Sequence, residues 1–235
     1  MNPIGWCDCT INPISGCLNV CPYCYARRMA KRLAGRFGYP ADDPFRPTFH
    51  PDKLQDIYNL HGAGKRVFLD SMGDWFSLDV DPAWIRATID AVRSKPEHTF
   101  LVLTKRPDQT AVLRKLDIPS NLWFGVTVDR QYSAWRIEEM LYKSYISRGG
   151  GNFVSFEPLH GPISCNLKHV DWVIIGAESG NRKDKISTKP EWAKQLTEQA
   201  REKGIPVFHK DNLIKSLNLT PDFISKEFPG EMQRC

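Results

Sequence analysis

The chain has 235 residues, of which 41% are hydrophobic and 25% charged, and its formal net charge is +5 at pH 7. This composition is typical of a packed globular protein and excludes a disordered or low-complexity chain. We expect a single domain over residues 1–235, since this length suits one sizeable core. The modest positive charge is compatible with an anionic partner but does not by itself indicate one.

The segment before the first cysteine and the hydropathy of the chain bear on its location. No apolar run reaches the roughly 18 to 20 residues that cross a bilayer, and residues 1–6 lack the charged and apolar regions of a signal peptide. We therefore expect no membrane partner and a cytoplasmic protein.

Five of the seven cysteines lie between Cys7 and Cys24. Metal binding explains this clustering better than disulfides do, because the cytoplasm keeps thiols reduced.

Short apolar runs alternate with helix-like stretches along the chain, which is the pattern of repeated βα units around a parallel sheet. We predict strands at residues 66–70, 99–103, 122–128, 152–156, 172–175 and 206–209. We predict helices at residues 25–34, 82–93, 109–116, 133–146 and 190–203. With a first strand before the cysteine loop, these elements predict an α/β fold, a partial (β/α)6-type TIM barrel of six or seven units. A doubly wound open sheet is the alternative.

Three cysteines, Cys17, Cys21 and Cys24, lie within eight residues on the loop that leads into the first predicted helix. Thiolates bind zinc or iron–sulfur clusters in preference to hard cations. A local set of three leaves one metal position open for a further ligand. The motif therefore predicts a metal centre at this loop.

The C-x3-C-x2-C spacing, with Tyr23 directly before the third cysteine, resembles the signature of the radical SAM superfamily. In that superfamily the three cysteines hold a [4Fe–4S] cluster, and S-adenosylmethionine (SAM) binds its fourth iron through amino and carboxylate groups. Reduction then splits SAM and releases a 5′-deoxyadenosyl radical. The resemblance implies Cys17, Cys21 and Cys24 as cluster ligands, a radical SAM barrel with the cluster loop after the first strand, and a reductant such as flavodoxin or ferredoxin as partner.

Two other interpretations of the cysteines stay open. In a structural zinc site, Cys7 or Cys9 would supply a fourth thiolate and close a tetrahedral set. The same fourth ligand on an iron–sulfur cluster would block SAM and make the chain an electron-transfer protein. Zinc modules usually pair two C-x2-C knuckles, and a ferredoxin rarely needs so much βα architecture, so both rank below the radical SAM interpretation.

Polar residues follow several predicted strands, at the end of a parallel barrel where ligands bind. The resemblance implies that Gly73 and Asp74 meet the SAM amino group, although the preceding Ser-Met departs from the usual Gly-Gly-acid segment. It also implies ribose contacts from Thr127 and Asp129, and an adenine-supporting strand that ends at Gly176. The residues predicted to bind the cofactor are Tyr23, Gly73, Asp74, Thr127, Asp129, Gly176 and Glu178.

Lys105, Glu157 and Lys210 are the predicted catalytic residues on the substrate side. They bring charge and hydrogen-bonding capacity to the same end of the barrel, which is what a pocket uses to orient a polar substrate. Their separate roles as acid, base or anchor stay open.

Further segments resemble a narrower, poorly characterised radical-SAM-like family found in bacteriophages, archaea and bacteria. They are Trp6, Asn12-Pro13, Ser15-Gly16-Cys17, His98-Thr99-Phe100, Leu103-Thr104-Lys105-Arg106-Pro107, Phe156-Glu157-Pro158, Gly161-Pro162-Ile163 and Asp171-Trp172-Val173-Ile174. The segment Tyr23-Cys24-Tyr25 is also similar to spore photoproduct lyase, a thymine-dimer repair enzyme. Phage association would suit a reaction on a nucleotide or DNA.

The basic residues after the cysteines bear on the same substrate class. They are Arg27, Arg28, Lys31, Arg32 and Arg36. Such a cluster would attract phosphates, whereas a solvated helix face is the simpler explanation. The predicted substrate is a nucleotide or nucleic acid, with a peptide or small metabolite as the alternative.

Overall fold

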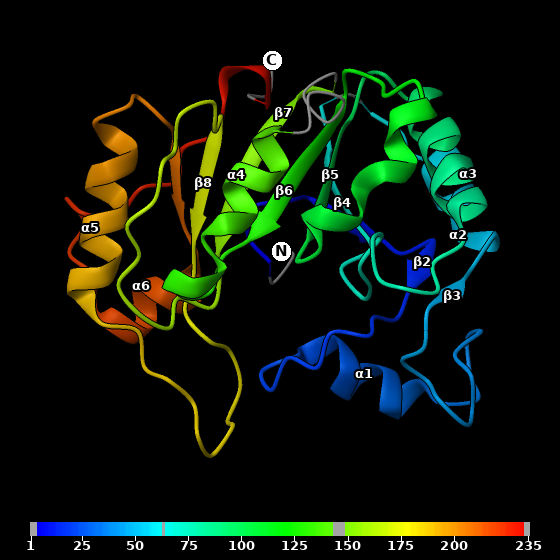
Figure 1. Ribbon diagram of the computed structural model, residues 1–235, viewed down its shortest axis with the longest axis horizontal. Coiled ribbons are helices and arrows are strands. Elements are labelled where there is room, and N and C mark those ends of the chain that lie inside the picture. The colour runs from blue at the N-terminus through cyan, green and yellow to red at the C-terminus, as the bar shows by residue number, and fades with distance from the viewer. Residues whose placement is uncertain (1–3, 63, 143–148, 233–235) are drawn as a thin grey trace.

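The computed structural model describes residues 4–62, 64–142 and 149–232 (Figure 1). Within them, seven parallel strands form one sheet in the order β1-β4-β5-β6-β7-β8-β9. Their bounds are β1 Cys9–Ile11, β4 Arg66–Leu69, β5 Thr99–Thr104, β6 Leu122–Thr127, β7 Gly151–Phe156, β8 Trp172–Ile175 and β9 Val207–His209. The spatial order follows the chain without a reversal, which excludes the doubly wound sheet. The predicted partial barrel is confirmed, and its seven strands fall within the predicted six or seven units.

Helices cover the outer face of the curled sheet (Figure 1). The predicted helices at 82–93 and 190–203 are α3 Pro82–Arg93 and α5 Pro190–Arg201. Both begin with proline, whose fixed φ and missing N–H suit the first helical position. The carboxylate of Asp81 also caps α3, since its Oδ1 accepts from the Ala83 N–H at 2.8 Å. No helix in the described part of the chain is long and apolar enough to cross a membrane.

Two predicted helices differ from the structure. Residues 109–116 were expected in an α-helix, but Pro107–Lys115 is a 3₁₀ helix. Its turns close through i to i+3 bonds, and the Thr110 hydroxyl reinforces the first turn by donating to the Pro107 carbonyl at 2.8 Å. The prediction for 133–146 corresponds to a 3₁₀ turn at Gln131–Ser133 followed by α4 at Trp135–Tyr142, and its last residues, 143–146, lie outside the described residues.

The cysteine loop lies between short elements, of which only the helix was expected. Strand β2, Ile14–Ser15, pairs antiparallel with β3, Thr48–Phe49. The predicted helix at 25–34 is α1 at Tyr25–Leu33. The sequence analysis missed three further helices, α2 Asp52–Tyr58, α6 Asp211–Leu217 and the 3₁₀ turn Gly230–Met232. Elements this short carry too few residues for a periodic pattern to show.

The strands bury both of their faces, so alternate residues enter two different cores. Aliphatic residues such as Val102 and Val154 face outward, beneath the helices. Many inward-facing positions carry large rings, including Phe153 and Trp172, and the N-terminal Trp6 packs among them. Gly125 is inward-facing too, and a Cβ there would collide with the Phe153 ring, so only glycine fits. The inner core is therefore closed by aromatic rings from strands and N-terminal segment alike.

The same alternation carries polar residues to the carboxyl end of the barrel. Thr127 lies two residues after the inward-facing Gly125, and Lys210 lies two residues after the inward-facing Phe208. Each therefore continues an inward-facing row past the end of its strand. By the same alternation, inward-facing rows on the other strands lead to Lys105, Asp70, Glu157 and Gly176. The pleat thus aims the side chains that follow the strands at one place above the inner core.

Candidate functional site

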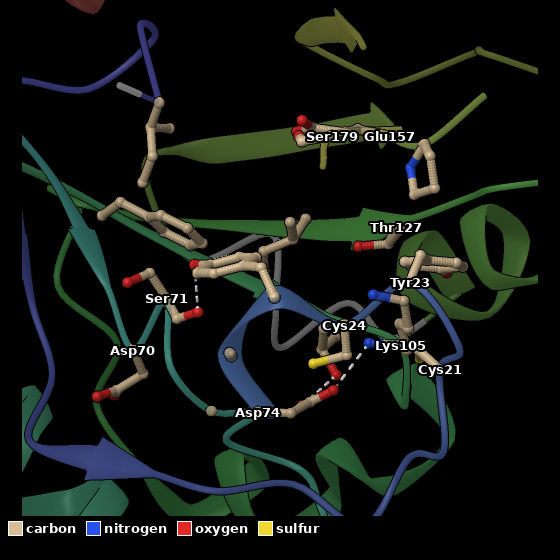
Figure 2. A pocket seen from close by; sticks show the side chains of 18 of the residues that line it. Cys21, Tyr23, Cys24, Asp70, Ser71, Asp74, Lys105, Thr127, Glu157 and Ser179 are labelled. Atoms are coloured by element: carbon tan, nitrogen blue, oxygen red, sulfur yellow. Dashed lines mark hydrogen bonds between the residues drawn. The ribbon is translucent and has the colours of Figure 1, made fainter. Parts of the chain in front are cut away.

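A cavity of about 350 Å³ opens at the carboxyl end of the sheet, between the strand ends and the cysteine loop (Figure 2). A volume of this size falls in the range of small-molecule sites. The predicted site residues that line it are Cys21, Tyr23, Cys24, Gly73, Asp74, Lys105, Thr127, Glu157, Glu178 and Lys210. Cys17, Asp129 and Gly176 were also predicted, and they lie outside the lining. The fold thus gathers most of the predicted residues around one space.

Hydrogen bonds hold the cysteine loop in shape. The guanidinium of Arg27 donates to the carbonyls of Cys17 at 3.1 Å and Asn19 at 3.2 Å. Cys24 occupies the N-cap of α1, where its Sγ accepts from the Arg27 N–H at 3.3 Å. The Cys17 Sγ accepts from the Asn19 N–H at 3.3 Å. Two of the three sulfurs therefore accept hydrogen bonds from backbone N–H groups, which hold them in place in the loop.

A close backbone contact anchors this loop to the sheet. Gly16, just before Cys17, has φ +87°, and a Cβ there would collide with the Arg46 carbonyl. Gly73 lies opposite, in a parallel bridge with Gly16, and a Cβ on it would stand 2.9 Å from the Ile14 carbonyl oxygen. Both positions favour glycine, Gly16 because of its positive φ and the nearby Arg46 backbone, and Gly73 because the backbone of residues 14–16 lies against it.

The burial and the spacing of the cysteines bear on which metal group they could hold. Burial raises the pKa of Cys17 to about 11, so that thiol stays neutral unless a cation binds. In the described part of the chain, no three His, Cys, Asp or Glu side chains converge closely enough to hold a single metal ion. This holds for Cys7 and Cys9 as it does for Cys17, Cys21 and Cys24. Cys21 and Cys24 line the cavity, so a metal centre held by this loop would border it.

Asp74 joins the cysteine loop to the strand ends. Its Oδ1 accepts from the Thr104 hydroxyl at 2.6 Å and the Phe76 N–H at 3.1 Å. Its Oδ2 accepts from the Lys105 N–H at 3.0 Å and the Asn19 side-chain amide at 3.4 Å. Both oxygens of this buried carboxylate are thus used by the protein itself. The arrangement makes Asp74 a positioning residue for Lys105 and the loop.

Asp129 lies behind Tyr23 rather than in the cavity wall. The Tyr23 hydroxyl donates to Asp129 Oδ2 at 3.0 Å, and burial is the main cause that raises the Tyr23 pKa. Asp129 Oδ1 also accepts from the Ser133 hydroxyl at 3.0 Å, and Arg136 lies 3.7 Å away. The carboxylate therefore fixes the orientation of the ring that precedes Cys24.

Glu178 is part of a buried ionic network. Its carboxylate accepts two bonds from the Arg182 guanidinium, at 2.8 and 3.0 Å, and pairs with His160 Nε2 at 2.8 Å. The Arg182 bonds are the main cause that lowers the Glu178 pKa. His160 also contacts the Tyr23 ring edge-on, with ring centroids 5.2 Å apart. The sequence analysis missed His160, although it follows Glu157-Pro158 in a segment already marked as strand-end.

Glu157 and Lys210 form an ion pair with a shortest N–O distance of 2.6 Å. Asn212, also missed, donates to Glu157 Oε1 at 3.4 Å. Gly176 lies beneath the pair, where a Cβ would stand 2.9 Å from Glu157 Cγ and 3.0 Å from Lys210 Cδ. Gly176 thus leaves room for the ion pair and does not face the cavity.

Part of the cavity lining is apolar and aromatic. Trp6 and Phe68, whose ring centroids are 4.6 Å apart, line it together with Leu103. Tyr25 also lines the cavity, and its hydroxyl donates to the Ser71 carbonyl at 2.6 Å. The cavity therefore combines apolar rings with charged groups, which suits a ligand with an aromatic part and a polar part.

Comparison with solved structures identifies the fold class. A spore photoproduct lyase mutant with bound AdoMet and dinucleoside spore photoproduct matches with TM-score 0.53 and 11% identity, over 86% of this chain and 75% of that chain. A spore photoproduct lyase complex with dinucleoside spore photoproduct matches with TM-score 0.48 and 11% identity, over 84% and 74%. The fold is thus the partial barrel that an AdoMet-bound enzyme also has.

Residues 1–215 match the model of a family described as protein of unknown function, DUF5131. The chain belongs to this family. No curated protein matches the sequence. The description agrees with the predicted membership of a poorly characterised family, whose association with phages stays a prediction.

Proposed function

We propose that this protein is a radical SAM enzyme that acts on a nucleotide or DNA substrate. The observation that carries the proposal is the loop with Cys17, Cys21 and Cys24, which borders a cavity of about 350 Å³ in a barrel of the AdoMet-binding kind. The three cysteines would hold a [4Fe–4S] cluster, and SAM would bind in the cavity. When bound, the cluster supplies the electron that splits the SAM sulfonium and yields a 5′-deoxyadenosyl radical.

In this proposal the lining residues bind SAM and the neighbours behind them set the geometry. Gly73 and Thr127 line the cavity beside the cysteines and would contact SAM directly. Asp74, Asp129 and Glu178 would act through the residues that they hold, because their carboxylates already accept bonds from the protein. Preorganised networks of this kind keep a bound cofactor in one orientation.

The charged groups would orient the substrate. Glu157 and Lys210 hold one another at 2.6 Å at the edge of the cavity, and either can exchange that bond for one to a polar substrate atom. The ammonium of Lys105 lies 5.8 Å from the centroid of the Tyr23 ring and leaves its donors available to an anionic group. The apolar wall at Trp6 and Phe68 would exclude water from the reacting atoms.

Besides the basic charge after the cysteines, the nucleotide substrate is supported by analogy with a protein of the same fold. The structural neighbour holds a dinucleoside ligand together with AdoMet. A peptide or small metabolite is the other substrate class that this cavity would admit. A one-electron donor of the flavodoxin or ferredoxin kind would reduce the cluster.

Anaerobic reconstitution tests the proposal. Iron and sulfide are loaded, SAM and dithionite are added, and 5′-deoxyadenosine is measured by mass spectrometry. We expect it from the wild type and from Cys165→Ser, whose thiol lies outside the cavity lining, but not from Cys21→Ser. Bound zinc in place of iron, or a loaded cluster that yields no deoxyadenosine with SAM, would contradict the proposal.

A further inference from the structure

The positive charge of the protein is concentrated at the mouth of the cavity. Helix α1 and the loop at residues 179–189 together carry eight basic residues and one acidic residue, Asp184. This excess is larger than the net charge of +5 of the whole chain, so the remainder carries no net positive charge. Such asymmetry is the electrostatic footprint of a surface that binds a polyanion.

The two basic segments meet across the mouth. Figure 1 shows the loop after β8 extending on the same side of the sheet as α1. A Cβ added to Gly180 in this loop would lie 3.2 Å from Nη2 of Arg28 in α1. On α1, Tyr25 lines the cavity, and Arg28 follows three residues later on the same helix face. The charges therefore begin at the cavity and continue away from it.

Five side chains form what we term the basic rim, and all of them are exposed. They are Arg28, Lys31 and Arg32 of α1, and Lys183 and Lys185 of the loop after β8. Within the described residues none of the five has a carboxylate at ion-pair distance, whereas Arg182 beside them is held by Glu178 at 2.8 Å. Their charges are thus available to a ligand.

Exposed aromatic rings lie at the same edge of the sheet. Tyr25 is 49% exposed, and Tyr132 and Trp135, which follow the carboxyl end of β6, are 69% and 46% exposed. The Arg130 guanidinium lies 5.8 Å from the centroid of the Tyr132 ring. Proteins that bind single strands hold the backbone with cations and stack the bases on exposed rings, and both kinds of side chain are present at this edge.

We propose that the basic rim binds the phosphates of a single-stranded nucleic acid that crosses the mouth of the cavity. The inference rests on the proposed function and narrows its substrate from nucleotides in general to a strand. A mononucleotide carries its charge at one end and would engage only part of the rim. An acidic protein would meet the same charges but would leave the exposed rings without bases to stack, so the observations favour the strand.

Fluorescence anisotropy of a labelled single-stranded DNA of about 12 nucleotides tests this inference on the full-length protein. Binding is measured from about 50 to 200 mM salt, where each phosphate contact contributes roughly 0.7 to the slope of log K against log salt. The rim variant combines Arg28→Ala, Arg32→Ala, Lys183→Ala and Lys185→Ala. The matched control removes as many charges elsewhere, with Lys115→Ala, Lys168→Ala, Lys194→Ala and Lys203→Ala.

We expect the rim variant to bind at least about tenfold more weakly and to lose about 2 to 3 from the slope, while the control stays near the wild type. Equal losses in both variants would overturn the proposal. The proposal would also be overturned if a mononucleotide competed as well as the strand. The same holds if the rim bound an acidic ferredoxin but no oligonucleotide. Wild-type protein that forms deoxyadenosine but does not bind the strand would overturn this inference and leave the proposed function standing.

Discussion

The two ends of the barrel interior are built from the same strands but from opposite kinds of side chain. Toward the amino ends of the strands, the inward positions carry Trp123, Phe153 and Trp172. The rings of Phe153 and Trp172 pack against Trp6, each with its centroid 6.1 Å from that of Trp6. Toward the carboxyl ends, the same rows carry the charged and hydroxyl groups of the cavity, including Glu157 and Lys210.

This difference teaches where stability and function reside. Aromatic rings fill the amino end, and each buries about 150 to 250 Å². The carboxyl end stays hollow, and its polar groups are held by ion pairs and hydrogen bonds to one another. Substitutions at the aromatic end should therefore unfold the protein, whereas those at the polar end should alter binding and turnover.

The largest expected effect is that of Trp172→Ala. Removing this fully buried ring should lower the free energy of unfolding by about 3 to 5 kcal/mol, because a cavity remains inside the barrel. Urea denaturation measures it, with Trp135→Ala as control, since Trp135 is 46% exposed. A loss for Trp172→Ala no greater than for the control would break the comparison.

The free energy of unfolding should change with pH by about 3 kcal/mol because of His209, which lies on the outer side of β9. His209 Nδ1 accepts from the Ser225 N–H at 3.1 Å and Nε2 bonds the Thr197 hydroxyl at 2.9 Å, so the buried ring is neutral. Burial lowers the pKa of His209 to about 4. Because the unfolded chain then binds the extra proton, stability should fall as the pH decreases from about 6.5 to 4.

Urea denaturation across this pH range measures the effect, and His209→Gln should flatten the curve while His61→Gln, an exposed position, should not. An identical pH dependence in wild type and His209→Gln would assign the effect to other groups.

At the polar end, Lys210→Met should reduce turnover about 100-fold while the free energy of unfolding falls by about 1 kcal/mol, since the pair borders the cavity and water can solvate Glu157. Lys226→Met is the matched control, because Lys226 forms an ion pair with Asp211 at the same 2.6 Å on the surface. Deoxyadenosine formation and urea denaturation, measured together, separate the two effects. Equal loss of activity in both variants would show that the Glu157–Lys210 ion pair has no specific role in the site.

The smallest expected effect is that of Tyr23→Phe, which removes one hydrogen bond to Asp129. The cost should be about 1 kcal/mol, because Asp129 keeps its bond to Ser133 and its proximity to Arg136. Thermal unfolding of the unloaded protein gives the stability change, and the rate of iron loss from the loaded protein reports on the loop. Tyr58→Phe, on exposed α2, is the control. An unchanged rate of iron loss would show that the ring does not order the loop.

The strands were predictable because fully buried strands are continuous apolar runs that stop where polar residues begin. That boundary also located Thr127, Glu157 and Lys210 at the cavity. The ribbon of β2 and β3 could not be found in this way, because each strand has two residues and is defined by its partner. His160 and Asn212 were missed for a similar reason, since their partners Glu178 and Glu157 lie 18 and 55 residues away.

The sequence by itself determined the cysteine spacing, the alternation of strands and helices, and the end of the barrel where polar residues gather, because these depend on neighbouring residues. Only the tertiary structure decided which polar groups face the cavity and which are used internally. Asp74 and Thr104 are 30 residues apart, Glu157 and Lys210 are 53, and Tyr23 and Asp129 are 106. Such pairs form only when the sheet curls, since hydrogen bonds and ion pairs require atoms within about 3 to 4 Å.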